Sequence, residues 1–349
     1  MIPYVEVLDK YSRKRFELVE PQECWFELSY YEVGEFEVYC NATAKNLKAL
    51  KKGHYIKLPN KEFIWVITSI RYTFSVEGVR MILAKGKEAK WLLTKRVIQT
   101  PIELQGTITS AIYGLVNANL GETATEARKI KGFTVDANNL LIDISGTQAT
   151  RGNLLAFVNK FLQSYNCGSQ VVYKDGALLY KIFNGNVKPH IRFSQSLDNL
   201  ISSEYLTDEE ELGTHALVVS TVDEVDYTQV YDTGKEGIDR AEVLVNSNLS
   251  TKYEDANGEE QETTPNSALY KGWQVEEGKN ELATHIAIEE VNGEIDLQNS
   301  NYEFVTDFYI GDIVKIQDEY FNFSLFPRIL KYTLRQDANG YGEQVDYGG

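Results

Sequence analysis

The residues with the best-known catalytic and metal-binding chemistry are few in this chain and lie far apart. The four histidines stand singly, and no two of them have a metal-ligand spacing such as HxxxH. The three cysteines form no CxxC pair, which is typical of reduced, buried thiols in a protein made in a cytosol. These residues are His54, His190, His215, His285, Cys24, Cys40 and Cys167. We therefore predict no metal site and no cofactor site.

Motifs of nucleophilic and phosphate chemistry are also missing. The sequence has no GxSxG elbow, no Walker A pattern and no GxGxxG loop after a strand. Two carboxylates suffice for glycoside hydrolysis, and the chain has 51 acidic residues, so a cell-wall-degrading hydrolase stays an alternative. Four tryptophans could stack on sugars, so a carbohydrate-binding adhesion module is a second alternative. The prediction is a protein with no catalytic residue, hence not an enzyme.

Two DANG stretches, Asp255–Gly258 and Asp337–Gly340, have the acidic and glycine residues of a calcium loop but the wrong spacing. A calcium loop places its glycine at the sixth position, whereas here glycine follows three residues after the aspartate. Asn-Gly readily supplies positive φ, so both stretches predict tight turns.

The bulk properties narrow the class of protein. The 349 residues predict two to four compact units, and 22 Tyr with 15 Phe favour sheets and interfaces over helical bundles. A net charge of −16 argues against a protein that wraps nucleic acid by neutralising phosphates, although DNA could still slide past without sticking. The first residues lack the pattern of a signal peptide, and no apolar run is long enough to span a membrane.

Residues 1–98 predict an N-terminal barrel-like domain of short strands. Phe36, Val38 and Cys40 alternate with Glu35, Glu37 and Tyr39, which is the period of a half-buried strand. Further apolar runs follow, and glycines separate them.

Residues 99–190 predict an α+β domain of two helices and a hairpin. The first helix has an apolar stripe from Ile108 to Val116, and Thr107 can cap it. The second begins near Leu154, and Gly168 is the expected left-handed residue after its end. Asp175-Gly176, between two apolar runs, predicts the hairpin turn.

The last two segments are extended again. Residues 191–280 predict a connecting, partly irregular region, with a long exposed loop over 255–267. Residues 281–349, together with parts of 191–220, predict a C-terminal β-barrel. In this meander Gly311 permits a sharp change of direction, and Asp312 can accept backbone hydrogen bonds. We single out Gly311, Asp312, Arg328 and Gly340 as its structural motif.

The order of these elements resembles the tail-hub proteins of long-tailed bacteriophages and prophages, including the N-terminal module of tail-associated lysins. The C-terminal residues that carry the resemblance are Tyr309, Gly311, Asp312, Ile313, Val314, Arg328, Ile329, Asp337 and Gly340. The N-terminal ones are Gly34, Phe36, Gly53, Ile56, Val66, Ile67, Ile70, Gly86, Leu92, Leu93 and Arg96. Residues 221–280 show no family pattern. Many relatives continue into a peptidoglycan hydrolase or a fibre, so we expect a hub without an attached tool, because this sequence stops at Gly349.

The resemblance implies a mainly β protein with two β-barrel domains joined by an α+β domain. It implies a homotrimeric ring at the tail tip of a virion, made in the cytoplasm of the host bacterium. Such a ring would close the tail tube and bind the distal tail protein and tail fibre or receptor-binding proteins. DNA would pass through without specific binding, which agrees with the charge of −16.

Overall fold

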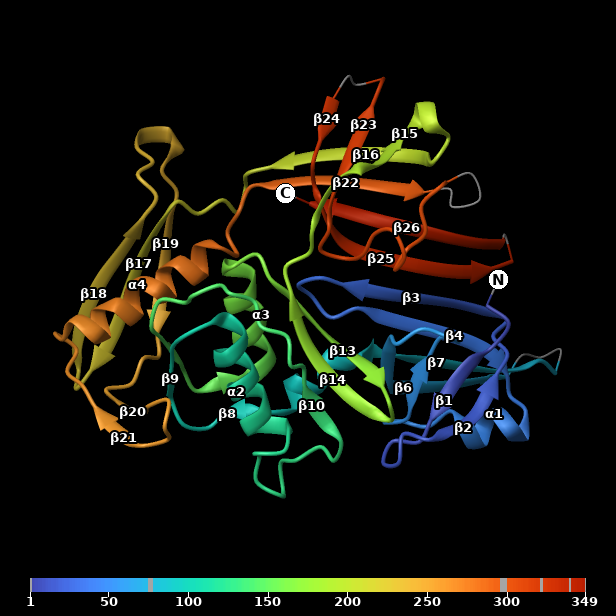
Figure 1. The fold of residues 1–349 in the computed structure, drawn as a ribbon, viewed down its shortest axis with the longest axis horizontal. Helices are drawn as coiled ribbons and strands as arrows, with labels where there is room; N and C mark the ends of the chain where they lie inside the picture. The colour runs from blue at the N-terminus through green and yellow to red at the C-terminus, as the bar shows by residue number, and fades with distance from the viewer. Residues whose placement is uncertain (1, 75–77, 296–299, 321–322, 339, 349) are drawn as a thin grey trace.

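The computed structural model describes residues 2–74, 78–295, 300–320, 323–338 and 340–348. The protein is mainly β, as predicted, and 14 of its strands belong to one sheet. The N-terminal strands form one end of the molecule in Figure 1, and the C-terminal strands lie above them. A third group of elements, β17 to β19 with α4, forms the opposite end.

The N-terminal part of the sheet holds seven strands in the order β3-β4-β7-β6-β5-β1-β2. Their bounds are β1 Val5–Leu8, β2 Arg15–Val19, β3 Glu23–Ser29, β4 Glu35–Asn41, β5 Tyr55–Lys57, β6 Ile64–Phe74 and β7 Arg80–Glu88. The alternation predicted for β4 is confirmed, because Phe36, Val38 and Cys40 are buried. A short helix, α1 Ala44–Ala49, was not predicted; Thr43 caps it by accepting a hydrogen bond from the Asn46 N–H.

The C-terminal strands continue the same sheet, because β25 pairs with β3. Their bounds are β15 Val187–Ser194, β16 Leu200–Asp208, β22 Ile288–Ile295, β23 Ile313–Asp318, β24 Phe323–Leu325, β25 Arg328–Asp337 and β26 Gly340–Gly348. Both parts share one apolar core, which includes Val5 and Phe36 from the first part and Phe193 and Tyr347 from the second. The strands predicted for the two barrels therefore belong to one continuous hydrogen-bonded sheet.

An α+β unit packs against this sheet (Figure 1). It contains α2 Ile108–Leu120, α3 Leu154–Ser164, β8 Val97–Ile98, β9 Ile102–Leu104, β10 Phe133–Val135, β11 Thr147–Ala149, β12 Gly152–Asn153, β13 Gly168–Lys174 and β14 Ala177–Phe183. Both helices, the Thr107 cap and the turn at Asp175-Gly176 are confirmed. The predicted role of Gly168 is wrong: Asn166 takes the left-handed conformation, with φ +54°, and Gly168 begins β13.

Residues 209–282, which we call the acidic unit, are more ordered than the sequence predicts. They contain β17 His215–Val222, β18 Val225–Asp232, β19 Glu242–Ser247, β20 Lys252–Glu254, β21 Glu260–Glu262 and α4 Ala268–Leu282. The predicted long loop over 255–267 instead holds β21 and the cap of α4, Ser267. Helix α4 escaped prediction because its covered face includes Gln274, Glu276 and Asn280, so its apolar periodicity is weak.

The described residues also form three short 3-10 helices: η1 Ala89–Lys95, η2 Gln195–Leu197 and η3 Gly237–Asp239. Over the residues that the structure describes, no helix combines the length and apolarity that crossing a bilayer would need.

Candidate functional site

The four residues predicted as a structural motif do not all meet. Gly311, Asp312 and Arg328 lie together where the N-terminal strands, the α+β unit and the C-terminal strands join. Gly340 lies apart, in the turn between β25 and β26, where it pairs with Asp337 and has φ +127°. The site built by the first three residues is a structural joint, and we call it the three-part joint.

Gly311 makes this joint possible because its backbone and its lack of a side chain are both needed. Its φ is +87°, and a Cβ there would lie 2.3 Å from the ring of Tyr30. Gly185 approaches equally closely, since a Cβ on it would lie 1.9 Å from the Gly311 carbonyl oxygen. The Tyr30 hydroxyl donates to the carbonyl oxygens of Asn166 at 2.8 Å and Phe183 at 3.1 Å. One tyrosine thus fixes all three parts.

Asp312 is a buried carboxylate, 2% exposed, whose oxygens are all engaged. The backbone N–H groups of Asn186, at 2.8 Å, and Tyr309, at 2.9 Å, donate to it. The Lys188 ammonium lies 2.9 Å away and supplies the opposite charge. The two backbone donors and the Lys188 ammonium compensate for the burial of this side chain, so Asp312 ties β15 to the start of β23.

Arg328 crosses the same joint from β25. Its guanidinium donates to the carbonyl oxygens of Asn184, at 2.7 Å, and Gly311, at 2.6 Å. It also lies 5.3 Å from the centroid of the Tyr30 ring, close enough for a cation–π contact. Each of these contacts joins residues that are distant in the sequence.

A second buried charge pair that the sequence analysis missed lies near this joint. Glu88 and Lys90 are 1% and 0% exposed, and Nζ lies 3.9 Å from a carboxylate oxygen. Lys90 donates to the carbonyl oxygens of Ser29, at 2.7 Å, and Ser169, at 3.2 Å. Burial raises the pKa of Glu88 and lowers the pKa of Lys90, while each partner opposes the shift of the other. No sequence motif marks such a pair, because Glu88 is simply the last residue of strand β7 and Lys90 lies two residues further on.

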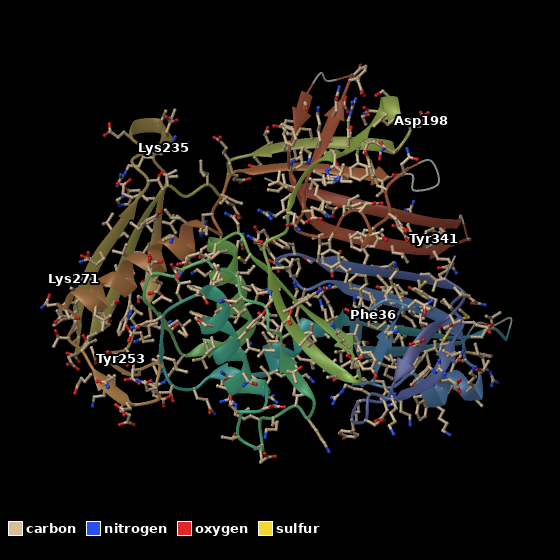
Figure 2. The ribbon with its side chains drawn as sticks, viewed as in Figure 1. Phe36, Asp198, Lys235, Tyr253, Lys271 and Tyr341 are labelled. Atoms are coloured by element: carbon tan, nitrogen blue, oxygen red, sulfur yellow. The ribbon has the colours of Figure 1, made fainter. Side chains whose placement is uncertain are left out.

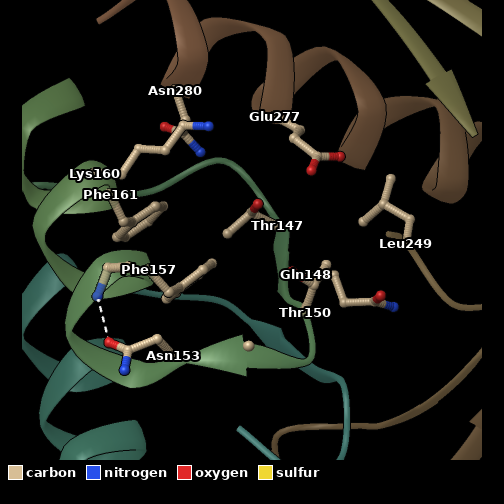
Figure 3. A pocket seen from close by; sticks show the side chains of 12 residues that line it. Thr147, Gln148, Thr150, Asn153, Phe157, Lys160, Phe161, Leu249, Glu277 and Asn280 are labelled. Carbon is tan, nitrogen blue, oxygen red and sulfur yellow. Dashed lines mark hydrogen bonds between the residues drawn. The ribbon is translucent and has the colours of Figure 1, made fainter. Parts of the chain in front are cut away.

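A pocket of about 240 Å³ lies between α3 and α4 (Figure 3). Glu277 is the one acidic residue among its described lining residues, and the Ser247 hydroxyl donates to it at 2.5 Å. Burial raises the pKa of Glu277. Lys160 contacts Glu281 rather than Glu277 in an ion pair. Glycoside hydrolysis needs two facing carboxylates, so the lining of this pocket does not fit that chemistry.

The three cysteines are buried, and His215 lies in a charged cluster. Burial raises the pKa of Cys24 to about 12 and that of Cys40 and Cys167 to about 11, so all three are thiols at neutral pH. His215 Nδ1 lies 3.0 Å from Asp232, in a cluster with an arginine. Within the described ranges, no group of three or more His, Cys, Asp or Glu side chains could hold a metal ion.

Solved structures with a similar fold include three tail proteins, two of which are described as prophage proteins. The tail protein from Neisseria meningitidis MC58 has a TM-score of 0.60 at 11% identity, covering 99% of this chain and 96% of that one. The 43 kDa tail protein of prophage MuSo2 from Shewanella oneidensis has a TM-score of 0.58 at 10% identity, with 99% and 97% covered. Prophage tail protein gp18 from Listeria monocytogenes EGD-e has a TM-score of 0.52 at 12% identity, and the match covers 99% of this chain and 94% of that one. The chain therefore has the fold of a prophage tail protein.

The sequence itself gives the family. Residues 4–348 match the family described as "Siphovirus ReqiPepy6 Gp37-like protein", and the chain belongs to this family. No curated protein sequence matches the chain significantly. The resemblance to phage tail proteins that the sequence analysis reports is confirmed by the family and by the fold.

Proposed function

We propose that this protein is a structural hub at the distal end of a phage tail. Three copies form a ring that closes the tail tube. The ring joins the distal tail protein to tail fibre or receptor-binding proteins, and DNA leaves through it. The protein is a virion component made in the host cytoplasm, and it works by holding parts together rather than by catalysis.

One observation carries this proposal. Strands from both ends of the chain form one 14-stranded sheet, and the whole chain has the fold of prophage tail proteins. The order of paired strands in this sheet begins with β2 and ends with β16. Within the described strands, each of these two outer strands is paired along one edge in this order, and its other edge has no strand beside it. Exposed strand edges are commonly covered by a neighbouring chain, and a ring of identical copies does this with a single kind of contact.

The charge and the joint support the same role. A net charge of −16 keeps phosphate backbones from adhering, as a passage for DNA requires. The three-part joint, built from Gly311, Asp312 and Arg328, ties the N-terminal strands, the α+β unit and the C-terminal strands together, which suits a part that holds other tail proteins in place.

Light scattering and negative-stain electron microscopy of the purified protein test the proposal. We expect a mass of three chains that persists over a tenfold dilution, and particles that show a ring with a central opening. A mass of one chain at every concentration, with no ring in the presence of the distal tail protein, would refute the trimeric hub. Clearing of a cell-wall gel by the pure protein would instead favour the hydrolase alternative.

A further inference from the structure

The acidic unit has an uncovered sheet face. Helix α4 packs on one side of β17, β18 and β19, where Ala216, Val218 and Val245 are buried. On the other side Leu217 pairs with Val230 and with Leu244 in direct register. These three side chains are 37%, 45% and 61% exposed. An apolar row across three strands, open to solvent, is unusual for the outer face of a sheet.

Negative charge lies on both sides of this apolar row, directly beside it on one side and two rows away on the other. Asp232 and Glu242 flank His215 in the next register row, with Arg240 between the two carboxylates as the local positive charge. On the other side the next row is the uncharged Val219, Thr228 and Asn246, and Asp226 follows one row further, paired with Thr221. The acidic unit as a whole has 18 acidic and 5 basic residues, whereas the rest of the chain has 33 acidic and 30 basic residues. Nearly all of the net charge is therefore carried by this one unit.

A surface of the opposite kind lies on the N-terminal domain. It is formed by the β1–β2 turn, β2, α1 and the turn before β5, and we call it the basic patch. Its exposed basic residues are Lys10, Lys14, Arg15, Lys45, Lys48, Lys51 and Lys52. Tyr11, Phe16 and Leu47, which are 75%, 42% and 42% exposed, give it an apolar part.

Contacts between these segments make the basic patch one surface. The Lys48 ammonium lies 5.9 Å from the centroid of the Phe16 ring, and Lys45 lies 3.4 Å from Glu17. A Cβ on Gly53 would lie 3.4 Å from the Lys10 side chain. The patch thus has the same design as the acidic sheet face, an apolar part bordered by charge, but with the opposite sign.

The two surfaces lie at opposite ends of the longest axis of the molecule. In Figure 1, β17 to β19 form one end, whereas α1, β1 and β2 form the other. A closed ring with head-to-tail contacts needs two different, non-overlapping surfaces on each copy. Complementary charge steers such surfaces together, and buried apolar side chains then hold them.

We propose that the uncovered face of β17–β19 in one copy is covered by the basic patch of a second copy. This interface rests on the proposed ring and specifies which surfaces close it. Leu217, Val230 and Leu244 meet the apolar side chains of the basic patch, and the lysines face the acidic border.

Cysteine cross-linking tests this contact with the full-length protein. The native cysteines are all buried, so they give little background. We expect that Leu244→Cys mixed with Lys48→Cys gives a disulfide-linked pair of chains, and that a chain carrying both gives a linked trimer. In the control, Leu141→Cys replaces Leu244→Cys. Leu141 is 84% exposed and lies outside both surfaces, so this variant should give no disulfide-linked pair of chains.

A second variant tests the energy of the contact. Leu244→Glu adds a charge to the apolar row and should weaken trimer formation at least tenfold, as measured by light scattering over a dilution series. Leu141→Glu should leave the mass unchanged, and circular dichroism checks that both variants keep their fold.

The outcomes separate this interface from the proposed ring. A wild-type trimer that gives no cross-link and keeps its mass with Leu244→Glu overturns the interface and leaves the ring intact. The uncovered face would then be left for another tail protein. A protein that is monomeric under all conditions overturns both proposals.

Discussion

The large sheet and the acidic unit are held together in different ways. The strands of the sheet share one core in which aromatic rings contact each other. The Phe26 ring stacks on that of Phe36, and its centroid lies 4.9 Å from the centroid of the Trp65 ring. The acidic unit has two small clusters, one around Val218 and one around Trp273. Apolar burial contributes to stability, so we expect the acidic unit to unfold more readily than the sheet.

The largest expected effect comes from removing one buried tryptophan in each region. Trp65→Ala and Trp273→Ala should each cost about 3–5 kcal/mol, because both rings are almost fully buried. We expect Trp65→Ala to lower the stability of the whole chain. Trp273→Ala should unfold the acidic unit alone, which hydrogen exchange with mass spectrometry would locate. Loss of protection throughout the chain with Trp273→Ala would show that the two regions unfold together.

A matched pair of glycines gives the next effect. Gly311 and Gly258 both have positive φ, +87° and +81°, but Gly311 faces the Tyr30 ring, whereas nothing lies within 4 Å of a Cβ on Gly258. Gly311→Ala should cost about 2–4 kcal/mol from backbone strain and overpacking together. Gly258→Ala should cost about 1 kcal/mol from backbone strain alone. Urea unfolding measures both, and equal costs would mean that Tyr30 moves aside freely.

Salt should act on the two regions differently. The acidic unit has 13 more acidic than basic residues, and repulsion among them opposes folding. Raising ionic strength from about 0.05 M to 0.5 M shortens the range of this repulsion and should stabilise the unit by about 1 kcal/mol. The sheet should change little. Hydrogen exchange at the two salt concentrations tests this, and a destabilised acidic unit would show that its ion pairs outweigh the repulsion.

The smallest effect concerns Glu277 and pH. Burial raises its pKa, so the folded unit binds this proton more tightly than the unfolded chain does. The group therefore stabilises the fold most below its unfolded pKa, and this contribution is lost as pH rises through the folded pKa. Glu277→Gln should slightly raise the melting temperature of the unit at pH 7. The advantage over the native protein should shrink towards pH 4, and an advantage that is constant with pH would contradict the assignment.

Several elements could be predicted because local physics decides them. Helices α2 and α3 have apolar stripes and side-chain caps at Thr107 and Asn153. Asp175-Gly176 forms its turn because that dipeptide accepts positive φ at both positions. Helix α4 could not be predicted in the same way, because Gln274 donates to Ser220 and to the Tyr227 carbonyl on the sheet beneath it. A polar residue that becomes buried through distant partners has no local signal.

The site shows the same division. The sequence by itself determined the mainly β class, the family resemblance and a change of direction at Gly311, because strand period and turn conformation depend on neighbouring residues. Tertiary structure alone decided that Gly311, Asp312 and Arg328 meet around Tyr30, and that Gly340 does not join them. It also decided that the predicted barrels share one sheet through β25 and β3. These pairings join residues some 300 positions apart, where only the geometry of the packed chain selects the partner.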